Sequence, residues 1–367
     1  MRRWPWPFLL LLVGTALATA RLVPAFSVQP EIVLAVFLPA LLFDAGFSMR
    51  AAAVRREVSW ILLLGLLGTI LAAATVFALL RLASFPSEEA LLLAAILAAT
   101  DPVSVFAALR RLHTPERLRV ALEGESLVND GLAVVLFAVA LSIVGSRAAG
   151  AADVIGLFLF LCVAGLLVGV VIGLVARWLM DRTPTGLQIA ISVVCAYAAY
   201  LLAEAIHGSG LLAVIAMSLI LGNAYQPSSH HLVHRFWRQL GFLMSSVVFL
   251  LVGLQVRLDA VWRVGGRLLI LVVAMLASRA LMVLLITAWR GDLWPWAWRL
   301  GLVWAGLRGA LSLALALSVP PDVAAQPQVL ALAFGFIFLS LAIQGLSTGP
   351  VFSRLGITRQ TAVKSVR

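Results

Sequence analysis

Long apolar runs separated by short polar breaks follow one another along nearly the whole chain, from Pro7 to Ser353. A helix that crosses a bilayer needs about 20 predominantly apolar residues, and the runs are close to that length. The breaks carry Pro, Arg, Asp, Glu or His, which are typical of loops. We therefore expect an all-α polytopic membrane protein with about twelve transmembrane helices, at 8–26, 31–47, 59–80, 89–109, 120–145, 154–176, 186–206, 209–224, 239–256, 267–289, 297–318 and 327–352.

Composition agrees with this pattern, since 63% of the residues are hydrophobic and only 12% are charged. A soluble fold could not cover that much apolar surface. The net charge of +11 does not indicate a nucleic-acid partner, because the basic residues are spread between apolar segments. Lys and Arg are concentrated on the side that holds both termini, apart from Arg257, Arg263 and Arg267. By the positive-inside rule, we expect both termini to lie in the cytoplasm. We expect the protein to be in the cell (inner) membrane.

The first residues have two interpretations. Arg2 and Arg3, an apolar run, and the small residues 18–20 resemble a secretory signal peptide. We favour a retained first helix, because the next loop is short and the charge asymmetry holds with that helix kept.

Charged side chains inside the predicted spans carry the strongest functional signal, because each costs about 2.5–3.5 kcal/mol on insertion scales. Asp101 is followed by Pro102, which removes a backbone donor and clashes with the preceding turn. We expect the helix to be unwound there, and broken helices mark ion sites in transporters. The alternative is a helix end at the membrane interface.

The next predicted helix adds further oxygen atoms. Ser126 and Asp130 are four residues apart and share a helix face, and Asn129 adds an amide. With Thr100 and Asp101 they form a ligand set that is all oxygen except for the amide nitrogen. Hard cations prefer oxygen ligands, so we expect a cation site here. The alternative is a polar cluster that only holds helices together.

A second irregular segment is expected in the eleventh predicted helix, where Gly306 and Gly309 flank Arg308. Asp101 lies in the fourth predicted helix. Helices 4 and 11 would then correspond, as would helices 5 and 12. This is the relation expected of an inverted repeat whose two unwound helices cross near the membrane midplane.

These motifs resemble a known family. The segments are Thr100-Asp101-Pro102, Gly124-Glu125-Ser126-Leu127-Val128-Asn129-Asp130-Gly131, Gly306-Leu307-Arg308-Gly309-Ala310-Leu311-Ser312 and Leu38-Pro39-Ala40-Leu41-Leu42-Phe43-Asp44. They resemble the monovalent cation–proton antiporters, and among them the electroneutral sodium–proton exchanger branch, which has Asn-Asp in place of Asp-Asp. The likeness runs over residues 7–355.

The resemblance implies a role for each buried polar residue. The implied cation and proton ligands are Asp130 as the main carboxylate, with Asp101, Ser126, the Thr100 carbonyl and Asp44. The implied structural set is an ion pair between Glu125 and Arg308, supported by Asn129 and Arg279. Family members often carry Glu at the position of Asp44.

The resemblance also implies a division of labour among the helices. Residues 57–147 and 265–355 would form the moving core, 1–50 and 184–256 the interface helices, and 151–180 a linker helix. Family members often have thirteen helices, and the first has no counterpart in our assignment. A homodimer is possible, and we expect no soluble regulatory domain in these residues.

The expected function is exchange of Na⁺, possibly Li⁺, for H⁺, because a proton and a cation can compete for Asp130. Asn129 cannot titrate, the only lysine is Lys364, and Arg279 stays protonated. We therefore expect electroneutral one-for-one exchange, although titration of Asp44 could add a proton. A K⁺/H⁺ antiporter and a cation channel are the alternatives. An intramembrane aspartyl protease is disfavoured because no Gly-x-Gly-Asp segment is present, and we expect no enzymatic activity and no cofactor.

Overall fold

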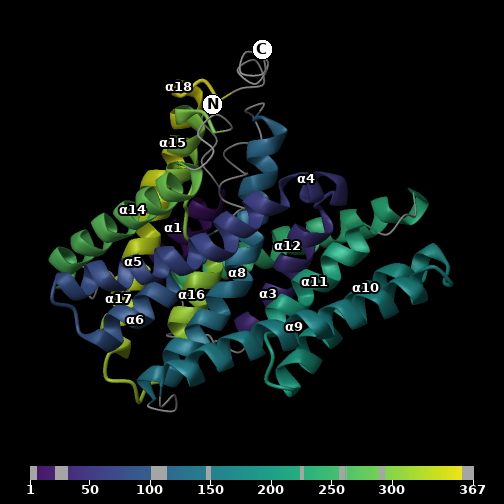
Figure 1. The fold of residues 1–367 in the computed structure, drawn as a ribbon, viewed down its shortest axis with the longest axis horizontal. Coiled ribbons are helices and arrows are strands. Elements are labelled where there is room, and N and C mark those ends of the chain that lie inside the picture. Colours follow the sequence, from purple (N-terminus) through teal and green to yellow (C-terminus); the bar gives the residue numbers. More distant parts are fainter. Residues whose placement is uncertain are drawn as a thin grey trace. The chain divides into compact units, whose positions relative to one another are not determined.

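The computed structural model describes residues 6–20, 32–100, 114–145, 150–223, 227–255, 261, 263–288 and 294–357 (Figure 1). Within these ranges all regular structure is helical, so the predicted all-α fold class is confirmed. The chain divides into two compact units. The first unit holds Met1–Ser27, Glu57–Ala133 and Phe249–Arg367, and the second holds Val28–Arg56 and Val134–Val248.

The first unit contains the N-terminal helix, the helices that follow Glu57 and the C-terminal third of the chain. Its helices are α1 (Trp6–Thr19), η2 (Leu63–Leu67), α5 (Gly68–Leu82), α6 (Ser87–Ile96), α14 (Gly265–Ala288), α15 (Trp296–Trp304), α16 (Ala310–Leu317), α17 (Gln326–Ser340), η4 (Leu341–Gly345) and α18 (Leu346–Arg354). The second unit contains η1 (Val33–Phe37), α3 (Leu38–Phe47), α9 (Ala151–Met180), α10 (Thr185–Ala205) and α11 (Gly210–Gly222). Three helices contribute residues to both units: α4 (Ala51–Leu62), α8 (Glu116–Val144) and α12 (Pro227–Gln255).

Among the described residues, seven helices are long and apolar enough to cross a membrane: Ala51–Leu82, Glu116–Val144, Ala151–Met180, Thr185–Ala205, His231–Gln255, Gly265–Ala288 and Gln326–Arg354. Shorter apolar helices cover Phe8–Thr19, Val33–Phe47 and Gly210–Gly222. The count of twelve stays a prediction, because the segments 101–113 and 21–31 lie outside the described residues.

The helix expected at 59–80 begins earlier in the structure, at Ala51. The charged residues before position 59 are therefore part of α4. One of them, Glu57, accepts a hydrogen bond at Oε2 from Arg117 Nε at 3.0 Å. Another ion pair joins Arg267 of α14 to Glu89 of α6 at 2.8 Å. Arg267 is one of the arginines that departed from the charge asymmetry of the sequence, and its pairing with a buried carboxylate explains its position.

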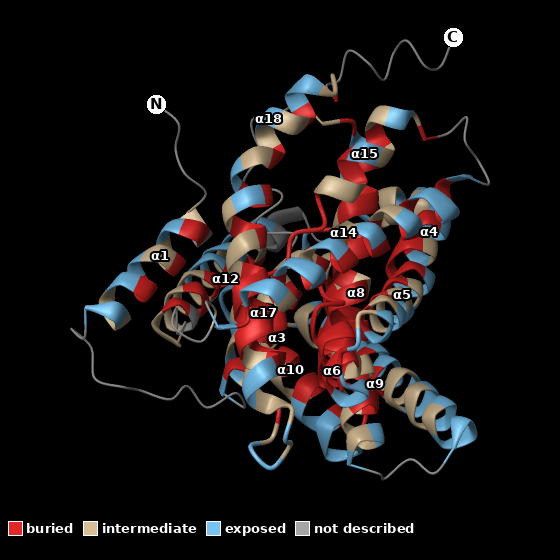
Figure 2. Cartoon of the chain, turned by 90° about the vertical axis from the view of Figure 1, so that its left-hand side faces the viewer, coloured by how far each residue is buried: buried red, intermediate tan, exposed pale blue. Residues whose placement is uncertain are grey.

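The hydrophobic core of the first unit lies where α4, α8, α14 and α15 meet. It contains the indoles of Trp60, Trp294 and Trp298, and the ring of Trp294 lies 5.0 Å from that of Trp60 at 69°. α5 packs against both α14 and α6. Seven of the ten residues of α6 are buried, and most of this helix is red in Figure 2.

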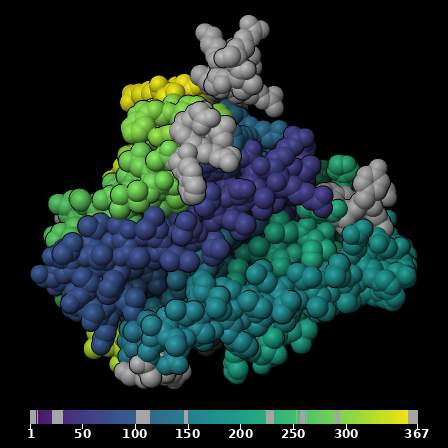
Figure 3. All heavy atoms as spheres, viewed as in Figure 1, coloured from purple at the N-terminus to yellow at the C-terminus, as the bar shows by residue number. Residues whose placement is uncertain are grey.

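In the second unit, α9 packs against α11 along a row of glycines at positions 165, 169 and 173. A Cβ added at Gly169 would overlap the carbonyl oxygen of Ala213, so the two helix backbones are in direct contact there. The rest of α9 is mostly exposed, and Figure 3 shows this teal helix along the visible surface. Such an apolar and exposed helix faces lipid in a membrane protein.

In the first unit one helix is interrupted and another ends near buried charge. α15 ends at Trp304, α16 begins at Ala310, and residues 306–309 are not helical. α6 ends at Ile96, and Ala99 and Thr100 are not helical. Asp101 and Pro102 lie outside the described residues, so the pair of crossing unwound helices stays a prediction.

Candidate functional site

α8 carries the largest group of buried polar side chains expected for the site. Glu125, Ser126, Asn129 and Asp130 are 1%, 6%, 2% and 7% exposed. Positions 126 and 130 lie one turn apart on the same helix face. A membrane helix can hold so many polar groups only where protein surrounds them, because lipid offers no hydrogen bonds.

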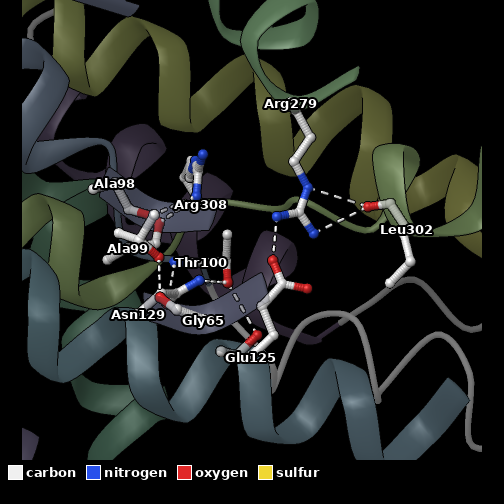
Figure 4. Close-up of polar contacts among 11 residues, drawn as sticks. Gly65, Ala98, Ala99, Thr100, Glu125, Asn129, Arg279, Leu302 and Arg308 are labelled. Atoms are coloured by element: carbon white, nitrogen blue, oxygen red, sulfur yellow. Dashed lines mark hydrogen bonds and ion pairs between the residues drawn. The ribbon is translucent and has the colours of Figure 1, made fainter. Parts of the chain in front are cut away.

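The end of α6 is joined to this face of α8 by three hydrogen bonds. The Thr100 amide donates to Asn129 Oδ1 at 3.1 Å, and Asn129 Nδ2 donates to Thr100 Oγ1 at 2.6 Å. The hydroxyls of Thr100 and Ser126 are 3.0 Å apart. The structure thus brings together Thr100, Ser126 and Asn129, and Asn129 bridges the end of a helix to its neighbour (Figure 4).

Glycines allow close packing around this network. A Cβ added at Gly65 in η2 would lie 2.7 Å from the Val128 Cβ, and one added at Gly124 would lie 2.6 Å from the Ile61 side chain. The Thr69 hydroxyl donates to the Gly65 carbonyl at 2.5 Å. η2 and α4 therefore pack closely against α8 at Val128 and Gly124, the positions that flank Glu125 in the sequence.

The partner of Glu125 differs from the expected one. Arg279 of α14 donates from Nη1 to Glu125 Oε1, and both side chains are buried. The same guanidinium donates from Nε and Nη2 to the Leu302 carbonyl at 3.2 and 3.1 Å (Figure 4). The expected ion pair between Glu125 and Arg308 is therefore corrected to Glu125 and Arg279.

Arg308 instead binds the end of α6. Its Nη1 donates to the carbonyl oxygens of Ala98 and Ala99, both at 2.9 Å. The last carbonyls of a helix lack intrahelical partners and carry partial negative charge, so a cation there is favourable. Figure 4 shows the Arg308 guanidinium directed at these two carbonyls.

Residues 1–354 match the family described as sodium/hydrogen exchanger, transmembrane. The chain belongs to the sodium/hydrogen exchanger family. It is a multi-pass membrane protein.

Named relatives of this exchanger cover almost all of it. The Na(+)/H(+) antiporter ApNhaP of Aphanothece halophytica is 36% identical over an alignment of 373 positions, which covers 97% of this chain and 70% of the relative. The Na(+)/H(+) antiporter NhaH of Halobacillus aidingensis is 32% identical over 370 residues, covering 95% and 91%. The solved sodium proton antiporter MjNhaP1 of Methanocaldococcus jannaschii has a TM-score of 0.79 at 21% identity, covering 95% and 92%, and shows the shared fold.

The structure does not test two of the expected ligands, Asp101 and Asp44. Asp101 lies outside the described residues. Asp44 lies on α3 in the second unit, where a Cβ added at Gly241 of α12 would be 3.2 Å from its Oδ2. Their membership of the ion site stays a prediction.

The sequence did not identify several groups that complete the polar network of this exchanger. The most important are backbone carbonyls, those of Ala98 and Ala99 for Arg308 and that of Leu302 for Arg279. No residue type identifies a carbonyl as a partner, although an interrupted helix signals that free carbonyls exist. The Ser312 hydroxyl, which donates to the Ala99 carbonyl at 3.5 Å, could have been identified from its place in the Gly306–Ser312 motif.

The arrangement suits reversible binding of a small cation or a proton. The hydroxyl oxygens of Thr100 and Ser126 lie 3.0 Å apart, and the buried Asp130 follows Ser126 by one turn of α8. Hydroxyl and carboxyl oxygens of this kind can replace a hydration shell. The buried positive charges are bound to other groups, Arg279 to Glu125 and Arg308 to helix-end carbonyls. The role of Asp130 as the carboxylate that exchanges a proton for a cation stays a prediction.

Proposed function

We propose that this protein is a secondary antiporter that exchanges Na⁺ or Li⁺ for H⁺ across the cell (inner) membrane. Asp130 carries the proposal as a buried carboxylate on α8, one turn from Ser126 and beside the Thr100–Asn129 network. Membership of the family and relatives named Na(+)/H(+) antiporters support it. They favour Na⁺ over the alternative of K⁺.

Competition for one carboxylate is sufficient for exchange. Burial disfavours an uncompensated charge on Asp130. The carboxylate is therefore stable in the membrane only when it holds a proton or a cation. Oxygens from Ser126, Thr100, Asp101 and, less directly, Asp44 would complete the cation shell. The loaded site is neutral and crosses as the protein changes conformation, whereas an empty charged site crosses poorly. Binding shifts the population between the two access states, and no chemical reaction is needed.

The charges around the site favour electroneutral exchange of one cation for one proton. Asn129 precedes Asp130 and cannot titrate. Arg279 is bound to Glu125. In this proposal Asp130 is the one carboxylate that titrates during transport, and a cycle through it moves no net charge.

We further propose that residues 57–147 and 265–355 form the moving core, 1–50 and 184–256 the interface helices, and 151–180 the linker. The grouping of Glu57–Ala133 with Phe249–Arg367 in one compact unit supports the core. Residues Met1–Ser27 group with that same unit rather than with Val28–Arg56. We also propose, on the basis of the loop charges, that both termini are cytoplasmic. The mass of the protein in detergent tests whether it forms a homodimer.

The proposal is tested with purified protein in sealed vesicles that contain a pH-sensitive dye. An outward Na⁺ gradient should drive proton uptake, Li⁺ should substitute for Na⁺, and K⁺ should have little effect. Once K⁺ is shown not to be a substrate, a membrane potential set with valinomycin should leave the steady-state Na⁺ gradient unchanged. Absence of Na⁺-driven proton movement would refute the antiport, and a shift with potential would refute electroneutrality.

A further inference from the structure

Ser340 at the end of α17 and Gln344 in η4 are buried polar side chains in an apolar segment, at 4% and 7% exposure. Residues four apart lie on the same helix face. Neither residue belongs to the ion-site motifs. Because a buried polar group inside a membrane requires hydrogen-bond partners within the protein, the partners of these two side chains indicate what they do.

The two side chains form a continuous chain of three hydrogen bonds. The backbone amide of Arg308 donates to Ser340 Oγ at 3.3 Å. The Ser340 hydroxyl donates to Gln344 Oε1 at 2.7 Å, and Gln344 Nε2 donates to the Trp304 carbonyl at 3.4 Å. The chain therefore begins at the amide of Arg308 and ends at the carbonyl of Trp304.

These two backbone groups would bond directly to each other in an intact helix. An α-helix joins each N–H to the carbonyl four residues earlier, and Arg308 is four residues after Trp304. The helix is interrupted between these residues, since α15 ends at Trp304 and residues 306–309 are not helical. Ser340 and Gln344 thus replace the missing helical hydrogen bond with a bridge of side chains, and insertion into the hydrogen-bond ladder is a known cause of a sharp kink.

The position of Arg308 matters for the ion site. Its guanidinium holds the Ala98 and Ala99 carbonyls, and the next residue, Thr100, bonds to Asn129 and lies 3.0 Å from the Ser126 hydroxyl. A shift of the Arg308 backbone would therefore move the end of α6, and with it Thr100.

We infer that Ser340 and Gln344 are positioning residues, which hold the α15–α16 break open and so set the geometry of the cation site. This inference rests on the proposed antiport at Asp130. If the pair served only to stabilise packing, its loss would lower stability without changing the affinity of the folded protein for Na⁺. If the pair positions the site, its loss changes the apparent KM for Na⁺ and frees the Arg308 amide.

The test compares Gln344→Met and Ser340→Ala with Ser347→Ala as the matched control. Ser347 accepts a hydrogen bond from Trp304 Nε1 at 2.9 Å, between the same two segments, but touches neither the Trp304 carbonyl nor the Arg308 amide. Ser340→Thr keeps the hydroxyl and should behave like the native protein. Each variant is measured for Na⁺-driven proton movement, for its melting temperature, and for hydrogen exchange of the backbone amide of Arg308.

We expect Gln344→Met and Ser340→Ala to raise the KM for Na⁺ about three- to tenfold, the effect of losing a buried hydrogen bond. Amide exchange at Arg308 should accelerate in both, and neither effect should appear in Ser347→Ala. An unchanged KM for Na⁺ would overturn the inference whatever the amide exchange at Arg308, as would equal effects in Ser347→Ala. Amide hydrogen exchange can be measured whether or not the protein transports Na⁺. If the native protein does not exchange Na⁺ for H⁺, the proposed function is refuted independently of the result at Arg308. If Gln344→Met does not fold, Ser340→Ala and Ser340→Thr decide the matter by the same readouts.

Discussion

α8 and α9 are consecutive helices of 29 and 30 residues, and both are apolar enough to span a membrane. They differ in what they bury. α8 buries Glu125, Ser126, Asn129 and Asp130, whereas the buried residues of α9 are three glycines and Ala176. α8 uses its buried face to place polar groups, and α9 uses its buried face to bring its backbone against α11.

The comparison shows that hydropathy alone does not reveal what a membrane helix does. α8 interrupts its apolar sequence with polar residues at helical spacing, and each of these residues finds protein around it. α9 interrupts its apolar sequence with glycines at the same spacing, and its large side chains remain exposed. Substitutions on the buried face of α8 should therefore change transport, and substitutions on the buried face of α9 should change folding.

The largest expected effect on stability is from Arg279→Met, which removes one partner of the Glu125 ion pair. Breaking a buried pair leaves an unpaired charge and costs about 3–5 kcal/mol in protein cores. The melting temperature in detergent should fall strongly, and Glu125→Gln combined with Arg279→Met should be less harmful than the sum of the two. When Glu125→Gln is combined with Arg308→Met instead, the loss of melting temperature should be closer to the sum of the two single losses. Stronger coupling to Arg308 would restore the pairing that the sequence suggested.

A somewhat smaller loss of stability is expected from Gly169→Leu on α9. The new side chain would begin at a Cβ that overlaps the Ala213 carbonyl oxygen, so the helices must separate. Overpacking of this kind costs about 1–3 kcal/mol, sometimes more. The matched control is Gly156→Leu on the same helix, where an added Cβ meets nothing within 4 Å. Yield of folded protein by size exclusion should fall only in Gly169→Leu, and equal yields would contradict the proposed role of the glycine row.

The smallest effect is expected from Ser126→Ala on α8. The substitution removes the hydroxyl that lies 3.0 Å from Thr100 Oγ1, at a cost of about 1 kcal/mol. The KM for Na⁺ should rise by less than about tenfold, with little change in melting temperature. Ser142→Ala, further along the same helix, serves as the control. A KM unchanged by Ser126→Ala would remove this hydroxyl from the cation site.

The sequence predicted the fold class, the family and the buried polar residues of α8, because apolar length and intramembrane charge are visible in residue types. The resemblance to the family implied a pair between Glu125 and Arg308, whereas the structure pairs Glu125 with Arg279. Sequence spacing gives the helix on which a charge lies. It does not give the partner that the charge reaches across an interrupted helix.

The remaining differences arise from groups that residue types do not display. Arg308 binds carbonyls of Ala98 and Ala99, and these residues look like ordinary apolar positions. Ser340 and Gln344 were visible as polar residues four apart, but their role depends on a backbone gap in another helix. Proposing such partners requires knowing where helices break, and only Pro102 and the glycines around Arg308 indicated this.

The most direct test of the central claim compares Asp130→Asn with Glu123→Gln, two carboxylate-to-amide changes on α8. Glu123 is partly exposed and lies 3.6 Å from Arg119 on the surface of the helix, whereas Asp130 is buried in the polar cluster. Both variants are reconstituted in vesicles, and Na⁺-driven proton movement is measured at equal amounts of folded protein. Asp130→Asn should abolish exchange and Glu123→Gln should retain it. Normal exchange in Asp130→Asn would contradict the account.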